Sequence, residues 1–296
     1  MKNKQDVFLL IFSGLFIAVI LIINVALLWN RGEGSSINSA QTISDANAER
    51  RNKKPKPSDV NNIFSKNIAV KAAFYQDIKE FLRPGDSVSM PAVRNSPDTP
   101  MTVGDNKFQT ALTKLAEVTQ SNLKKGIVFS AVDDVRNLIG VLPSDITIIG
   151  YDFEGGMTPL SEMQNPVGSV TQFAEIVHAA GKEVAFGPTV AVWNGLERNG
   201  KVPLVARAVD IVILQGQNIL SNGGMTALIE QVSTLGATAR NANPNVSFSV
   251  QLWVGNNPPA DMIAGFINIE DLIDTAIIGT QNDLSGVQEV LLGLGR

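Results

Sequence analysis

The chain has 296 residues, 44% of them hydrophobic and 18% charged, with a net charge of −4, no cysteine and a single histidine, His178. The lack of cysteine excludes disulfides, thiolate zinc sites and a cysteine nucleophile. One histidine excludes a metal site built from several histidines. We therefore expect no metal and no cofactor, and any catalysis must use carboxylates, hydroxyls, amides, lysines or aromatic rings.

An apolar segment opens the chain. Residues 7–29 carry no charge, and a helix of that length, at about 1.5 Å per residue, spans a bilayer core of about 30 Å. A cleaved signal peptide has a shorter apolar region, of about 7 to 15 residues. We predict an uncleaved transmembrane anchor over residues 1–30. Lys2 and Lys4 before the span favour a single-pass protein in the cell membrane with its C-terminal domain outside.

The next segment, residues 31–59, is rich in Ser, Asn, Ala, Lys and Pro without apolar periodicity, which predicts a flexible linker. Residues 60–296 then form one predicted domain. It contains 16 basic and 23 acidic residues, a net charge of −7. Because nucleic-acid binding depends on positive charge, we expect no nucleic-acid partner.

Short β-branched runs alternate with helical patterns through this domain. The expected strands are residues 126–132, 146–153, 183–190, 209–217, 246–254 and 275–280, with 86–93 as a weaker seventh. The expected helices are residues 107–124, 167–180, 223–241, 259–273 and 284–294. Such alternation predicts parallel βαβ units, and the domain has the usual size of a (β/α)8 TIM barrel. With six or seven strands in sight, either one strand is irregular or the barrel is incomplete. An open, doubly wound sheet competes, but no glycine-rich phosphate motif follows the first strand.

The strand at 246–254 favours the barrel over the open sheet. Phe248, Val250, Leu252 and Val254 share one face, whereas the other face carries Ser247, Ser249, Gln251 and Trp253. A central strand of an open sheet is apolar on both faces because helices cover both. A polar face instead predicts a barrel whose inner wall leads to a wet site.

The sharpest candidate for catalysis is the end of the strand at 146–153, where Asp152 and Glu154 follow Tyr151 and point the same way. Two adjacent carboxylates raise the pKa of at least one of them, which keeps a proton-donating acid available near neutral pH. Carboxylates at strand C-termini lie at the active-site mouth of a barrel. The alternative is a structural role in capping and ion pairing.

Amides follow the other strands. They are Gln215 and Gln217, Gln251 with Trp253, and Gln281 followed by Asp283. Amides both donate and accept hydrogen bonds, and an aromatic face can stack on a sugar ring. Together with Tyr151 they predict a substrate-binding cleft for a sugar, the alternative being a buried polar network inside the barrel.

These residues carry a resemblance. The order Tyr151-Asp152-Phe153-Glu154, Asn165-Pro166-Val167, Gly187-Pro188-Thr189, Gln215-Gly216-Gln217 and Asn243-Pro244-Asn245-Val246 leading to Gln251 resembles uncharacterised glycoside-hydrolase-like TIM barrels. The D-x-E strand end is also similar to part of the chitinase-type family. That resemblance implies Glu154 as proton donor and Asp152 as its partner, orienting the substrate's N-acetyl group. The chain departs from the longer acidic motif at Thr147 and Gly150.

The leading hypothesis is a membrane-anchored, extracytoplasmic barrel that binds a glycan or cell-envelope polysaccharide and, if it is an enzyme, hydrolyses it with Glu154 as general acid. Asp152 would then assist the substrate, or Asp283 would act as nucleophile or base. The alternative is a catalytically inactive glycan-binding or scaffold module, favoured by the departures at Thr147 and Gly150. A third hypothesis is a barrel enzyme with non-glycosidic chemistry, since the fold hosts many reactions.

Overall fold

The computed structural model of the protein describes residues 64–296. The predicted membrane span and linker lie outside these residues, so the anchor, the linker and the location of the domain outside the cell stay predictions. None of the helices within residues 64–296 combines the length and apolarity needed to cross a bilayer.

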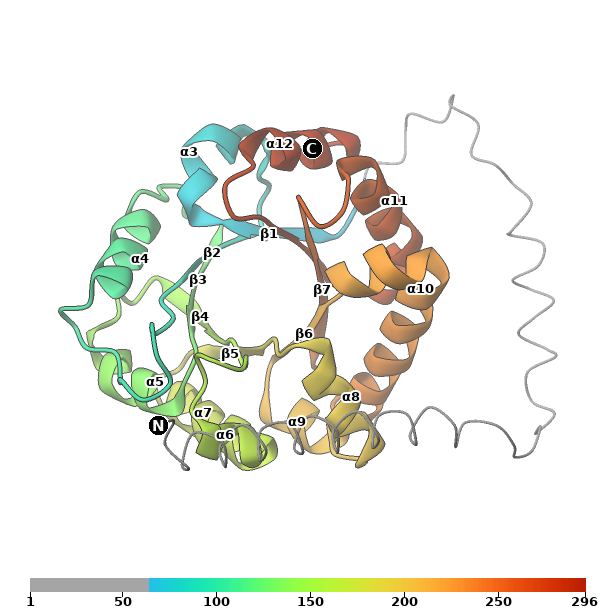
Figure 1. The fold of residues 1–296 in the computed structure, drawn as a ribbon. Helices are drawn as coiled ribbons and strands as arrows, with labels where there is room; N and C mark the ends of the chain where they lie inside the picture. Colours follow the sequence, from blue (N-terminus) through green and yellow to red (C-terminus); the bar gives the residue numbers. More distant parts are fainter. Residues whose placement is uncertain (1–63) are drawn as a thin grey trace, which may run out of the picture. The chain divides into compact units, whose positions relative to one another are not determined.

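Eight parallel strands close into a barrel in which each strand pairs with the next along the chain and β8 pairs with β1 (Figure 1). The strands are β1 Asn67–Lys71, β2 Ser87–Pro91, β3 Lys124–Phe129, β4 Ile146–Tyr151, β5 Glu183–Phe186, β6 Ile211–Gln215, β7 Ser247–Trp253 and β8 Thr275–Gly279. The predicted TIM barrel is thus confirmed, and its ring of strands is complete.

Helices surround the strands as an outer ring (Figure 1). They are α3 Tyr75–Ile78, α4 Asn106–Ala116, α5 Val132–Leu138, α6 Leu160–Gln164, α7 Pro166–Ala179, α8 Val190–Arg198, α9 Val202–Ala208, α10 Gln217–Ala242, α11 Pro259–Ile269 and α12 Leu284–Gly293. Short 3₁₀ turns lie at η1 Ala72–Phe74, η2 Lys79–Phe81, η3 Ile139–Val141 and η4 Glu270–Leu272. The predicted helix over 223–241 is the part of α10 that follows a kink at Gly224, whose φ of 71° only glycine adopts readily.

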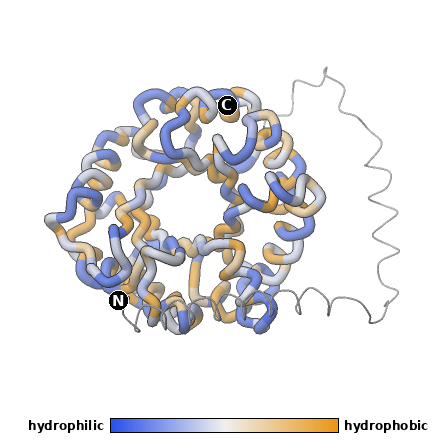
Figure 2. Tube along the Cα trace, viewed as in Figure 1, coloured by the Kyte–Doolittle hydropathy of each residue, from blue (hydrophilic) through white to orange (hydrophobic). Residues whose placement is uncertain are grey.

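The hydrophobic core lies between the strands and the helices. Figure 2 shows hydrophobic residues on the strands and on the helix sides that face them, with hydrophilic residues on the outer turns. In β4, for example, Ile149 and Tyr151 are buried on the outward face. In β7 the outward residues Phe248, Val250 and Leu252 are buried in the same way, as the alternating pattern of that strand predicts.

The strand that the sequence did not reveal is β1. Its five residues, Asn67–Lys71, run directly into η1 and α3, so the apolar run is short and merges with a helical pattern. Hydrogen-bonded pairing on both sides holds it in place, with Ala69 opposite Ser87 of β2 and Ile277 of β8. Pairing with β2 and β8, which closes the barrel, therefore determines this strand more than its own composition does.

An aspartate precedes each even-numbered strand, which marks a repeat of two-strand units. Three of the four accept a hydrogen bond from the main-chain N–H of the second residue of the preceding strand. These bonds are Ile68 N to Asp86 (2.7 Å), Val184 N to Asp210 (2.7 Å) and Phe248 N to Asp274 (2.8 Å). The fourth, Asp145, instead pairs with the Lys125 ammonium at 2.7 Å. Each aspartate thus fixes the start of one strand against its neighbour at the N-terminal end of the barrel.

Candidate functional site

A cavity of about 710 Å³ occupies the barrel, and the C-terminal ends of the strands form one of its ends, here called the mouth. In barrels of this class that end carries the active site. Seven of the residues predicted from sequence line the cavity, and they are Tyr151, Asp152, Glu154, Gln215, Gln217, Gln251 and Trp253. They come from three strands, and all of them except Tyr151, whose ring packs on α7, are candidates for contact with a ligand.

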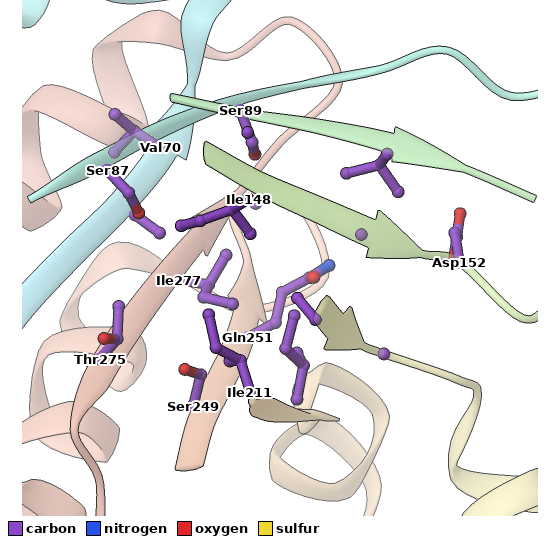
Figure 3. Close-up of a pocket in the computed structure, with 18 of the residues that line it drawn as sticks. Val70, Ser87, Ser89, Ile148, Asp152, Ile211, Ser249, Gln251, Thr275 and Ile277 are labelled. Carbon is purple, nitrogen blue, oxygen red and sulfur yellow. The ribbon is translucent and has the colours of Figure 1, made fainter. Parts of the chain in front are cut away.

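The main chain fixes the position of the carboxyl pair. The β4 ladder continues one residue past its last strand residue, because Asp152 N–H donates to the carbonyl of Phe129 in β3 (2.8 Å). The following turn is held by Thr158, whose hydroxyl accepts from Glu154 N–H at 3.0 Å. Asp152 and Glu154 both face the cavity, which confirms that they point the same way. Figure 3 shows Asp152 just beyond the end of its strand.

The two carboxyl groups share one environment and cannot both ionise freely. Burial, then the charge of Glu154 and a hydrogen bond with it, raise the pKa of Asp152 from 3.8 to about 7. Gln215 Nε2 donates to Glu154 Oε1 at 3.0 Å and to the carbonyl of Gly187 at 2.9 Å. Gln215 thus fixes the position of the Glu154 carboxyl group. With its raised pKa, Asp152 is the member of the pair that we assign the proton near neutral pH.

The remaining amides differ in how far they are already engaged. Gln217 Nε2 donates to the side-chain oxygen of Gln215, Oε1, at 3.5 Å. This bond extends the hydrogen-bonded chain that ends on Glu154. The Trp253 indole lies flat against Gly279, where an added Cβ would come within 2.4 Å of Nε1. Gln251 makes no side-chain hydrogen bond within residues 64–296. Its amide is thus a free donor and acceptor of the cavity. Within residues 64–296, Trp253 Nε1 and Gln217 Oε1 are also buried there without a hydrogen-bond partner.

The side chains of three predicted residues do not contribute to the cavity. The Tyr151 ring stacks on Phe173 of α7, with centroids 4.3 Å apart, and its hydroxyl donates to Glu162. Gln281 is exposed, as is Asp283. Asp283 caps α12 by accepting from Gly286 N–H at 2.9 Å, and this bond, with one from Ser285, lowers the pKa of its carboxyl. Tyr151 thus packs against α7, Gln281 contacts solvent, and Asp283 caps α12.

Lys71 is a cavity-lining residue that the sequence analysis did not single out. It is the last residue of β1 and shares the inward face with Asn67 and Ala69. Among the residues of 64–296 that line the mouth, it is the one cation. Its ammonium is 3.4 Å from the Gln281 carbonyl oxygen. Because β1 was not recognised as a strand, no pattern placed this lysine at a strand end.

The described part of the chain holds no group of three or more His, Asp or Glu side chains that could bind a metal ion. A buried ion pair does lie nearby, between Arg94 and Asp134 at 2.6 Å. Asp134 also accepts the main-chain N–H of Met101 at 2.8 Å. This pair closes the loop after β2 and is structural.

Comparisons with known proteins find similarity among solved structures only. The chain matches no protein-family model, and no curated protein matches its sequence. Among solved structures, the N-terminal domain of a putative aldolase from Bacteroides vulgatus has 14% identity over 77% of this chain and 86% of its own, with a TM-score of 0.45. RipC from Yersinia pestis has 11% identity over 78% and 96%, with a TM-score of 0.44. The citrate lyase beta subunit from M. tuberculosis, complexed with oxaloacetate and magnesium, has 9% identity over 79% and 100%, with a TM-score of 0.47.

The expected resemblance to glycoside hydrolases is wrong. The solved structures similar to this chain include a putative aldolase domain and a citrate lyase beta subunit, and no family match supports a glycosidase. The hypotheses that depended on this resemblance are wrong as well: glycan hydrolysis, an inactive glycan-binding module and a glycan partner. The site also removes one predicted catalytic role. Asp283, the predicted nucleophile or base, is exposed and caps α12.

Proposed function

We propose that the protein is a barrel enzyme that transfers a proton to and from a carbonyl compound carrying a carboxylate. The observation that carries this proposal is the carboxyl pair at the mouth, in which Asp152 holds a proton and Glu154 accepts a hydrogen bond from Gln215. This is the non-glycosidic barrel chemistry that remains from the sequence-based hypotheses. The similarity to solved structures supports the fold alone.

The pair supplies a base and an acid on one strand end. The Glu154 carboxylate can remove a proton from a carbon next to a carbonyl group, and the electron pair of the broken C–H bond moves to the carbonyl oxygen. Asp152, with a pKa of about 7, can give its proton to that oxygen, which completes an enol. The reverse transfer returns both protons. General acid–base catalysis of this kind is most effective when the pKa is close to the working pH.

The other cavity residues favour an anionic carbonyl compound. The Gln251 amide has no partner within residues 64–296 and can donate to a carbonyl oxygen, where negative charge develops during enolisation. Lys71 is the cation of the mouth and can bind a carboxylate. Oxo acids carry both groups that these side chains complement.

The test is hydrogen exchange at carbon. The full chain is incubated in D₂O with a panel of 2-oxo and 3-oxo acids, and loss of the α-proton signals is followed by ¹H NMR. We expect exchange with at least one oxo acid, and a reduction of about 10²–10⁴-fold in Glu154→Gln and in Asp152→Asn.

Asp283→Asn is the matched control, because it removes a carboxylate that lies on a helix cap instead of in the cavity. It should exchange at the rate of the unmodified protein. The proposal is overturned if no oxo acid exchanges above the buffer rate, or if both cavity variants retain full exchange.

A further inference from the structure

The cavity runs the length of the barrel. Its lining begins with residues at the first positions of the strands, such as Asn67, Ser87 and Thr275, and ends with Asp152 and Gln217 at the mouth. Its 710 Å³ equals the liquid volume of about 24 water molecules. The interior of a TIM barrel is normally filled by layers of bulky side chains. This barrel instead has an open lumen, by which we mean the part of the cavity enclosed by the eight strands.

The lumen is open because large inward side chains lie over glycines of the neighbouring strand. An added Cβ at Gly150 would be 2.9 Å from Val128, and one at Gly187 would be 3.2 Å from Ile213. Trp253 covers Gly279 in the same manner. Each large side chain thus lies along the wall above a residue that has no side chain, and does not reach the axis. The positions are neighbours in the sheet, as Val128 opposite Gly150 and Trp253 opposite Gly279 show.

The walls of the lumen are uncharged and largely apolar. Figure 3 shows Ile148, Ile211 and Ile277 pointing into the same space. Hydroxyls are interspersed and come from Ser87, Ser89, Ser249 and Thr275. Charged lining residues of the described chain lie at the two ends only. They are Lys124, Glu183, Asp210 and Asp274 at the strand starts, and Lys71 with the carboxyl pair at the mouth. Such a passage suits a narrow chain without charges of its own.

We propose that the lumen binds an unbranched aliphatic chain whose carboxylate end lies at the mouth. This inference names the substrate class of the same site. Only the placement of the carboxylate at the mouth rests on the proposed function. The aliphatic part depends on the volume and wall chemistry of the lumen. Filling 710 Å³ with an apolar chain removes both the isoleucine walls and the chain from water, which is favourable by roughly 25 cal/mol per Å² of apolar surface on each. Ions find no charged partner in the middle of the lumen within residues 64–296.

The test is the dependence of binding on chain length. Saturated straight-chain carboxylic acids with 4, 8, 12 and 16 carbons are titrated into the full chain by calorimetry below their micelle concentrations. We expect affinity to rise up to about fourfold for each added methylene until the lumen is full, and then to level off. Oligo(ethylene glycol) carboxylates of equal length should bind at least tenfold more weakly than the matching acids.

Two variants narrow the lumen at different depths. Ser87→Leu lies near the start of β2, and Ser89→Leu lies one inward position closer to the mouth. Both should keep the affinity for the shortest acid, and the length at which affinity levels off should be shorter in Ser89→Leu than in Ser87→Leu. If one variant does not fold, the other still tests the cut-off against the unmodified protein.

Affinity that does not change with chain length, or cut-offs unchanged by both leucines, would overturn the lumen as an aliphatic site. Oxo-acid exchange in D₂O with no dependence of binding on chain length would leave the proposed function in place and remove this inference alone. Chain-length dependence without exchange of any oxo acid would overturn the proposed function and leave the aliphatic site in place.

Discussion

The shared proton of the carboxyl pair makes a quantitative prediction about folding. Burial and Glu154 raise the pKa of Asp152 to about 7 in the folded protein, against 3.8 ordinarily. A folded-state pKa above the unfolded value means that the folded state binds the proton more tightly. The stability that this proton contributes is complete below pH 3.8 and is lost as the pH rises to 7 and beyond. At about 1.4 kcal/mol per pKa unit, the loss approaches 4 kcal/mol above pH 8.

Asp152→Asn isolates this effect, because asparagine keeps the shape and a donor for Glu154 but carries no titrating proton. The difference in unfolding free energy, variant minus unmodified chain, should increase by about 2–3 kcal/mol between pH 5 and pH 8, because proton binding is linked to folding. The assay is urea unfolding of both proteins at pH 5, 6, 7 and 8, followed by circular dichroism.

Asp98→Asn is the control, since Asp98 is exposed in the loop after β2 and far from the pair in sequence. Its pH profile should match that of the unmodified chain. Parallel profiles for Asp152→Asn and the unmodified chain would refute the assignment of the shared proton to Asp152.

Three further predictions concern the supports of the site and fold. Arg94→Met leaves the Asp134 charge buried without its partner and should lower the free energy of unfolding by about 3–5 kcal/mol, whereas Arg94→Met with Asp134→Leu should recover most of it in urea titrations. Asn165→Ala removes the hydrogen bond to Gly168 N–H at the start of α7 and should destabilise the protein by about 1 kcal/mol in the same titrations. Gln215→Leu should slow α-proton exchange by about 100-fold and shift its pH profile with little change in KM, because Glu154 loses the donor that positions it; an unchanged pH profile would contradict that role.

Local patterns predicted the barrel because they record which face of each strand is buried. The alternation in β7 indicated an apolar outer face and a polar inner face, and both are found as expected. The spacing of Asp152 and Glu154 placed both carboxyls in the cavity for the same reason, since side chains two apart on a strand share a face. The aspartates before β2, β6 and β8 were also visible in the sequence. Those before β6 and β8 each accept from the preceding strand, so Asp86 is the signal that could have indicated a strand ahead of it.

Local patterns did not predict which strand ends take part in the site. Gln251 lies near the end of β7, and Gln281 and Asp283 come shortly after the end of β8 at Gly279. Gln281 and Asp283 are nevertheless exposed. Tyr151 precedes Asp152 by one residue, and that single step places its ring on the helix side of the wall. Family resemblance built on these short motifs failed for the same reason: strand-end amides and acids recur in barrels that share little else.

The sequence by itself determined the composition limits, the alternation of strands and helices, and the pairing of two carboxyls on one strand. Only the tertiary structure decided that Gln215 from β6 donates to Glu154, that Lys71 from β1 lines the mouth, and that glycines opposite large residues leave the lumen open. The physical reason is the range of each interaction. Side-chain direction along a strand is set by adjacent residues, whereas a hydrogen bond across 61 residues or an unfilled space at the axis depends on how all eight strands close.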